Sequence, residues 1–98
     1  MEGLIKELFK HRKIAIAIIQ EYYSQIVDLY CYLGFGSKTD EDIIDDCISG
    51  YLTVNEDRNG YLWLWYYDGN KEGVISLNDS RNTMIIDNSE TIEAMFLR

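Results

Sequence analysis

The stretch Tyr61-Leu62-Trp63-Leu64-Trp65-Tyr66-Tyr67 decides the fold of this chain. In a β-strand, successive side chains point to opposite faces of the sheet. One face of this run, which we call the aromatic face, therefore carries Tyr61, Trp63, Trp65 and Tyr67. The opposite face carries Leu62, Leu64 and Tyr66. An edge strand with one wet face would not be apolar on both sides, so we expect residues 61–67 to form the central strand of a small sheet.

Turn signals and two further strand-like runs flank this central strand. The segment Asp57-Arg58-Asn59-Gly60 precedes it and contains Asn-Gly, a strong signal for a tight hairpin, and Asp68-Gly69-Asn70 follows it. Residues 51–55 and 73–77 are the flanking strands, because strands joined by such short turns must pair antiparallel. Residues 83–86 are a candidate fourth strand, and a short helix ends the chain.

The N-terminal third has helical periodicity. Apolar residues recur at steps of three and four through residues 3–33, which predicts a long helix with a wide apolar face. The basic cluster His11-Arg12-Lys13 is the expected place for a bend, and whether residues 4–33 form one helix or two stays open. The run from Ile14 to Ile19 alternates like a strand, but the helical period of its flanks favours a helix.

A second, acidic helix follows a glycine-containing loop. Gly34 is expected to end the first helix, and Thr39 is expected to cap the second in a capping box with Asp42. Gly50 should end this second helix. Its buried stripe is predicted to consist of Ile43, Ile44, Cys47 and Ile48. Three of its carboxylates are predicted to face away from that stripe and to be exposed to solvent, namely Asp42, Asp45 and Asp46.

These elements predict a single α+β domain spanning residues 1–98. In it, the long N-terminal helix and the short acidic helix pack on a three- to four-stranded antiparallel meander, with a short C-terminal helix. If the aromatic face is core, the long helix is expected to cover it, and the C-terminal helix is expected to cover Leu62 and Leu64.

The net charge of the chain limits the classes of partner that it is expected to bind. The net charge is −8, and residues 38–57 supply −6 of it. An acidic protein is repelled by nucleic acid and by anionic membranes, so we expect a protein partner with a basic surface and no direct nucleic-acid or membrane binding. The longest apolar run has six residues, and the N-terminus lacks the pattern of a secretory signal. The expected location is the cytoplasm.

No residue set predicts catalysis, a metal or a cofactor. Cys31 and Cys47 lie among apolar neighbours and are expected to be core thiols rather than a disulfide. His11 is the single histidine, and no nucleophile motif accompanies it. Residues 55–60 faintly resemble a calcium loop, but a hairpin turn explains them. We therefore expect no enzyme.

Two surfaces are candidates for binding. Three carboxylates of the acidic helix lie at i, i+3 and i+4, which gives either a solvated face or a docking surface for a basic partner. The aromatic face is either core or a partly exposed anchor, since Trp and Tyr dominate interface energetics. The predicted partner-binding residues are Asp42, Asp45, Asp46, Glu56, Asp57, Trp63 and Trp65.

The function expected from these features is that of a small, acidic, non-enzymatic protein-binding module. By analogy of class alone, it would be an inhibitor that docks on the basic surface of a nucleic-acid-acting enzyme, as toxin-immunity and phage anti-defence proteins do. A structural or oligomerisation protein, assembling as a homodimer through the aromatic face or the Ile-rich segment 14–19, is an alternative. A small-ligand binder with an aromatic pocket is another.

Overall fold

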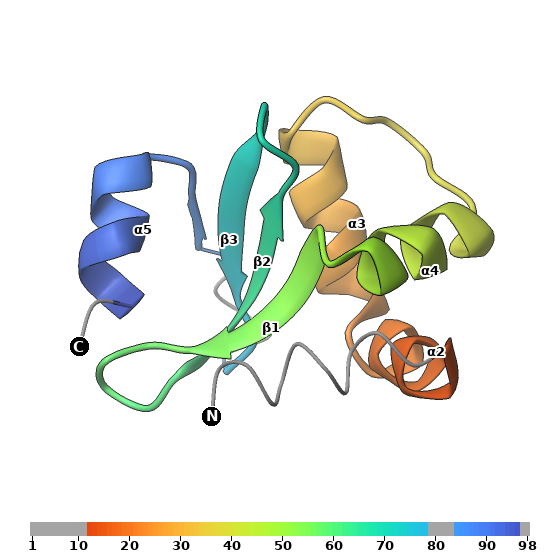
Figure 1. Cartoon of the computed structure of the whole chain (residues 1–98), viewed down its shortest axis with the longest axis horizontal. Helices are drawn as coiled ribbons and strands as arrows, with labels where there is room; N and C mark the ends of the chain where they lie inside the picture. The colour runs from red at the N-terminus through yellow and green to blue at the C-terminus, as the bar shows by residue number, and fades with distance from the viewer. Residues whose placement is uncertain (1–11, 79–83, 97–98) are drawn as a thin grey trace.

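The structure of the chain is a computed structural model, and it describes residues 12–78 and 84–96 (Figure 1). The helices are α2 (Arg12–Glu21), α3 (Tyr23–Tyr32), α4 (Asp40–Ser49) and α5 (Ser89–Phe96). The strands are β1 (Leu52–Glu56), β2 (Leu62–Tyr67), β3 (Glu72–Ser76) and β4 (Ile85–Ile86). They form one antiparallel sheet in the order β1-β2-β3-β4. The predicted α+β class and meander are confirmed, and β2 lies inside the sheet with a neighbour on each side.

The described part of the N-terminal segment is two helices rather than one. The break lies at Tyr22, whose φ of −121° and ψ of 30° leave the helical region. The predicted bend at residues 11–13 is wrong in its described part, because Arg12 and Lys13 lie inside α2, and His11 lies outside the described residues. The change of direction lets α2 pack against α4 while α3 packs on the sheet (Figure 1). The run from Ile14 to Ile19 is helical, as expected.

The C-terminus of α3 and the N-terminus of α4 are capped by local hydrogen bonds, at the residues that the sequence predicts. Gly34 has a φ of +87°, and the N–H groups of Gly34 and Phe35 donate to the carbonyls of Cys31 and Tyr30. This pair of bonds is a Schellman motif, which favours glycine at the left-handed position. At the start of α4, the Asp42 N–H donates to Thr39 Oγ1 at 3.2 Å, which confirms the capping box.

The larger core lies on the Leu64 face of the sheet. Leu64 is fully buried there and is flanked by Val54 of β1 and Ile75 of β3. Helix α3 approaches this face closely, since a Cβ at Gly73 would lie 3.2 Å from Leu29 and 3.3 Å from Leu33. The main core therefore lies between the sheet and helices α2, α3 and α4.

The aromatic face is covered by α5, on the other side of the sheet (Figure 1). Trp63 and Ile92 are buried together there, and Trp65 stacks on Phe96 with ring centroids 4.7 Å apart. The expected assignment of helices to faces was therefore wrong. The neighbouring strand explains the difference, because β1 places Thr53 on the aromatic face and its aliphatic residues on the other. The three packed helices cover the face that is aliphatic across three strands.

No described helix combines the length and the apolar character that a membrane span requires.

Candidate functional site

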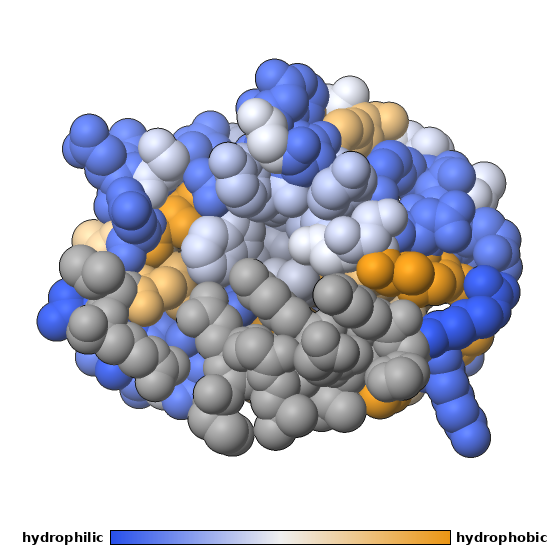
Figure 2. All heavy atoms as spheres, in the orientation of Figure 1, coloured by the Kyte–Doolittle hydropathy of each residue, from blue (hydrophilic) through white to orange (hydrophobic). Residues whose placement is uncertain are grey.

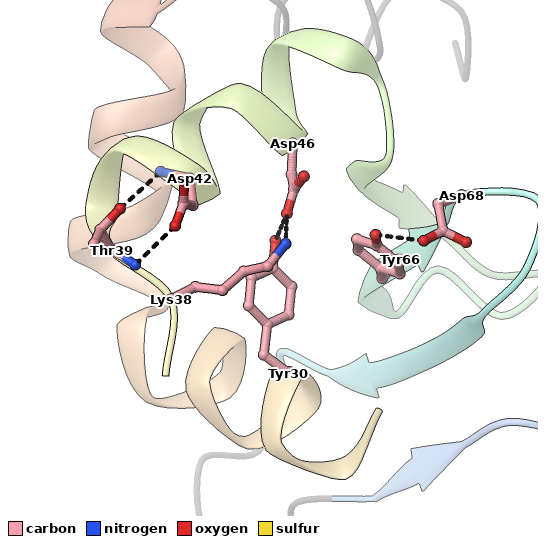
Figure 3. Close-up of polar contacts among 7 residues, drawn as sticks. All are labelled: Tyr30, Lys38, Thr39, Asp42, Asp46, Tyr66 and Asp68. Carbon is pink, nitrogen blue, oxygen red and sulfur yellow. Dashed lines mark hydrogen bonds and ion pairs between the residues drawn. The ribbon is translucent and has the colours of Figure 1, made fainter. Parts of the chain in front are cut away.

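Asp46 of the acidic helix is buried, and its carboxylate is held by two donors (Figure 3). Asp46 Oδ2 accepts hydrogen bonds from the Tyr30 hydroxyl at 2.7 Å and from Lys38 Nζ at 2.8 Å. The prediction that Asp46 faces solvent is wrong, since the residue is only 9% exposed. The buried side of α4 therefore differs from the predicted stripe. It includes Asp46, whereas Ile48, which was expected to be buried, is 40% exposed.

The ammonium group of Lys38 also lies over aromatic rings. It is 4.6 Å from the centroid of Phe35 and 5.0 Å from that of Tyr30. Burial, followed by the hydrogen bond to Asp46, raises the pKa of the Tyr30 hydroxyl well above its ordinary range. Burial and then Asp46 raise the pKa of the Cys47 thiol to about 12, so this thiol stays protonated at neutral pH. The polar groups of Tyr30, Lys38 and Asp46 thus bind one another, and the cluster stabilises the fold.

The other carboxylates of α4 have internal partners or lie at its rim. Asp42 belongs to the capping box. Glu41, which is exposed, accepts from the Arg12 guanidinium at 2.6 Å, and this hydrogen bond lowers the pKa of the Glu41 carboxyl. Asp45 is exposed, as predicted, and lies close enough to Arg12 to interact with its charge. Several carboxylates of the acidic helix are therefore bound to other groups of the same chain.

Asp57 and Trp63, both predicted to bind a partner, are joined to each other in the interior. Asp57 Oδ2 accepts from the Trp63 indole N–H at 2.9 Å, and Oδ1 accepts from the backbone N–H groups of Asn59 and Tyr61. Both residues are 7% exposed. Burial raises the pKa of Asp57, but these donors outweigh it and the pKa is lowered. Glu56, at the end of β1, is exposed.

Asp57→Asn should make the protein less stable at neutral pH and less sensitive to acid. Because the folded-state pKa of Asp57 lies below its ordinary value of 3.8, the ionised carboxylate stabilises the fold above that value, and this contribution is lost as pH falls through the folded-state pKa. Urea unfolding should show a lower midpoint for the variant at pH 7 and a smaller difference from the native chain at about pH 3. Asp45→Asn, at an exposed position, is the control. An equal difference at both pH values would contradict this assignment.

One end of the aromatic face remains open, and we call Tyr51, Trp65 and Tyr67 the open aromatic patch. Tyr51 follows α4 and Tyr67 ends β2, and the Tyr67 N–H donates to the Tyr51 carbonyl at 2.9 Å. Tyr51 is 43% and Tyr67 54% exposed, whereas Trp65 is partly buried. In Figure 2 the surface between α5 and α4 consists of pale atoms, of the intermediate hydropathy that Trp, Tyr and Thr share.

Two hollows meet at this patch. Both are lined by Trp65 and Tyr67. One, of about 80 Å³, is completed by Gly50, Tyr51 and Thr53. The other, of about 290 Å³, is completed by Glu72, Ser89 and Glu93. The larger hollow is thus lined by two aromatic residues of β2 and by one carboxylate each from β3 and α5.

Among the described residues, no basic side chain joins the two carboxylates in the wall of the larger hollow. Glu72 Oε2 accepts from the Trp65 indole N–H at 2.9 Å, while Glu93 is exposed on α5. None of the described residues that line either hollow is a lysine or an arginine. Lys71, next to Glu72 in sequence, instead donates to the Leu33 carbonyl on the opposite side of the sheet. The described residues of the patch are therefore aromatic and negatively charged.

The aromatic face, with Tyr67 beside Trp65, was predicted as a possible anchor, but only Trp63 and Trp65 of that face were named as partner-binding residues. Strand alternation does predict the position of Tyr67, on the same face of β2 as Trp65. Tyr51 precedes β1, and its ring lies 6.4 Å from that of Tyr66. The place of Glu93 could not be predicted, because its helix reaches the patch only through the packing of α5 on the sheet.

The described residues offer little for catalysis. No group of three or more His, Cys, Asp or Glu within 12–78 and 84–96 could hold a metal ion. Both cysteines are free, and Cys31 is exposed rather than in the core as expected. Comparison with protein-family models, with curated proteins and with solved structures found no match.

Proposed function

We propose that this chain is a non-enzymatic protein-binding module that docks on a basic surface of its partner through the open aromatic patch. The observation that carries the proposal is the end of the aromatic face that α5 leaves uncovered, where Tyr51 and Tyr67 are about half exposed. Aromatic residues of this kind supply most of the energy in protein interfaces. Carboxylates at the rim make a basic surface the complementary one.

The charge of the whole chain supports the same partner. A net charge of −8 speeds the approach of a positively charged protein and repels nucleic acid. Exposed carboxylates such as Asp45 and Glu56 would raise the association rate while the partner approaches, rather than form a buried contact in the complex.

Proteins with large basic surfaces are typically those that bind nucleic acid. The partner class that we propose is therefore a nucleic-acid-acting enzyme, which the module would inhibit by occupying the surface that binds the phosphate backbone. We place this encounter in the cytoplasm, where free thiols such as Cys31 remain reduced.

Affinity capture from cells of the native host, with Tyr67→Ala and Tyr61→Ala compared, tests this proposal. The two tyrosines are 54% and 55% exposed and belong to the same run, but only Tyr67 lies in the open aromatic patch. A partner that uses the patch should be lost with Tyr67→Ala and retained with Tyr61→Ala. Its capture should also weaken at high salt, because the contact is partly electrostatic.

Added DNA or RNA should displace that partner if it is a nucleic-acid-acting enzyme. Capture that survives Tyr67→Ala would contradict docking through the patch. Capture that nucleic acid does not reduce would contradict the inhibitor role while leaving protein binding in place.

Self-association remains a prediction, and the structure changes the surface that would serve it. The Ile-rich segment of α2 is largely absorbed by the core, with Ala15 and Ile19 buried. Tyr23 and Val27 of α3 are instead exposed, at 49% and 36%, one turn apart on the helix. This stripe is the better candidate for a homodimer contact than the segment 14–19.

A further inference from the structure

We propose that the open aromatic patch is a receptor for a guanidinium group, so that its occupant is an arginine side chain. The inference deepens the proposed function, since it names the residue type that a basic partner would insert. The larger hollow is the site, with Trp65 and Tyr67 as its rings and Glu72 and Glu93 as its carboxylates.

The rings offer a surface on which a cation can lie. One side of the Trp65 indole is stacked on Phe96, with an interplanar angle of 26°, which fixes the orientation of the ring. Tyr67 is exposed beside it and lines the same hollow. Trp and Tyr are the best aromatic partners for a cation, and arginine is the commonest cation in such contacts.

The carboxylates offer the complementary charge and hydrogen-bond acceptors. The Trp65 indole N–H binds Glu72 Oε2, which positions this carboxylate next to the rings. Glu93 approaches from α5, and no described lysine or arginine shares the hollow. A cation that enters can therefore meet rings and two carboxylates at once.

A guanidinium fits a site made of aromatic rings and carboxylates better than an ammonium does. It is planar and weakly hydrated, it stacks on aromatic rings, and its N–H groups match carboxylate oxygens in pairs. An ammonium group is a compact and strongly hydrated point charge.

Peptide titration of the ¹⁵N-labelled full chain tests the inference. The probes are three acetylated and amidated pentapeptides, Gly-Gly-X-Gly-Gly, in which X is arginine, lysine or citrulline. Citrulline retains the shape of arginine without its charge. The arginine peptide should shift the indole N–H signal of Trp65 but not that of Trp63, with a dissociation constant of about 1–10 mM. The lysine peptide should bind at least about threefold more weakly, and citrulline should cause no saturable shift.

Two pairs of variants locate the site. Glu93→Gln should weaken arginine binding, and Glu90→Gln, an exposed acid of the same helix that does not line the hollow, should not. Tyr67→Ala should weaken it and Tyr61→Ala should not. Equal binding of arginine and citrulline, equal binding of arginine and lysine, or no Trp65 shift at about 50 mM arginine peptide would each overturn the inference.

The outcomes also separate this inference from the proposed function. If the peptide does not bind but partner capture is lost with Tyr67→Ala, the patch binds proteins without an arginine anchor. If the peptide binds but no captured partner depends on Tyr67, the guanidinium site stands and the proposed function fails.

Discussion

Asp46→Ala is expected to lower the free energy of unfolding by about 2–4 kcal/mol, whereas Asp45→Ala should change it little. Removal of the Asp46 carboxylate leaves the Lys38 ammonium and the Tyr30 hydroxyl without their acceptor. Breaking a fully buried ion pair costs about 3–5 kcal/mol. The expected loss is smaller here because the side chains of Lys38 and Asp46 are 22% and 12% exposed, so water partly compensates.

Chemical denaturation followed by circular dichroism measures this difference. Asp45 is the matched control, because it is the adjacent carboxylate on the same helix but is exposed. Asp46→Asn should fall between the two, since its amide oxygen can still accept the hydrogen bonds that Oδ2 accepts but carries no negative charge to pair with Lys38. Equal stability of the two alanine variants would show that Asp46 is not held in the interior.

Trp63→Ala should destabilise the protein by about 3–5 kcal/mol, a large fraction of the total stability of a domain of this size. Trp63 is 7% exposed and packs with Val74 and Ile92 between the sheet and α5. Its loss leaves a cavity there and removes the indole donor from Asp57. Trp63 therefore belongs to the core, and its replacement should act on folding rather than on the off-rate of a partner.

Thermal and urea unfolding of three variants check this assignment. Trp63→Phe keeps most of the ring and should cost less than the alanine change, with about 1 kcal/mol of its effect from the lost hydrogen bond. Tyr61→Ala, at an exposed position of the same face, should be nearly neutral. A folded Trp63→Ala chain with an unchanged midpoint would contradict the burial of this ring.

Features that depend on neighbours in sequence were predictable. The capping box needs only Thr39 and Asp42, and the end of α3 needs a glycine at position 34. The antiparallel meander follows from short turns between strand-like runs, and the inner position of β2 follows from its apolar residues on both faces. Each of these depends on hydrogen bonds or alternation within a few residues, which the order of amino acids specifies directly.

The burial of Asp46 and the site at Trp65 were decided by tertiary packing. Asp46 is buried because Tyr30 and Lys38, 16 and 8 residues away, converge on it. The open aromatic patch exists because α5 covers Trp63 but leaves Tyr67 exposed. The sequence by itself determined the acidic helix, the strands and their order along the sheet, but not the break between α2 and α3. Tertiary structure decided which helix covers which face and which charges find partners, because those outcomes depend on packing between residues far apart in the chain.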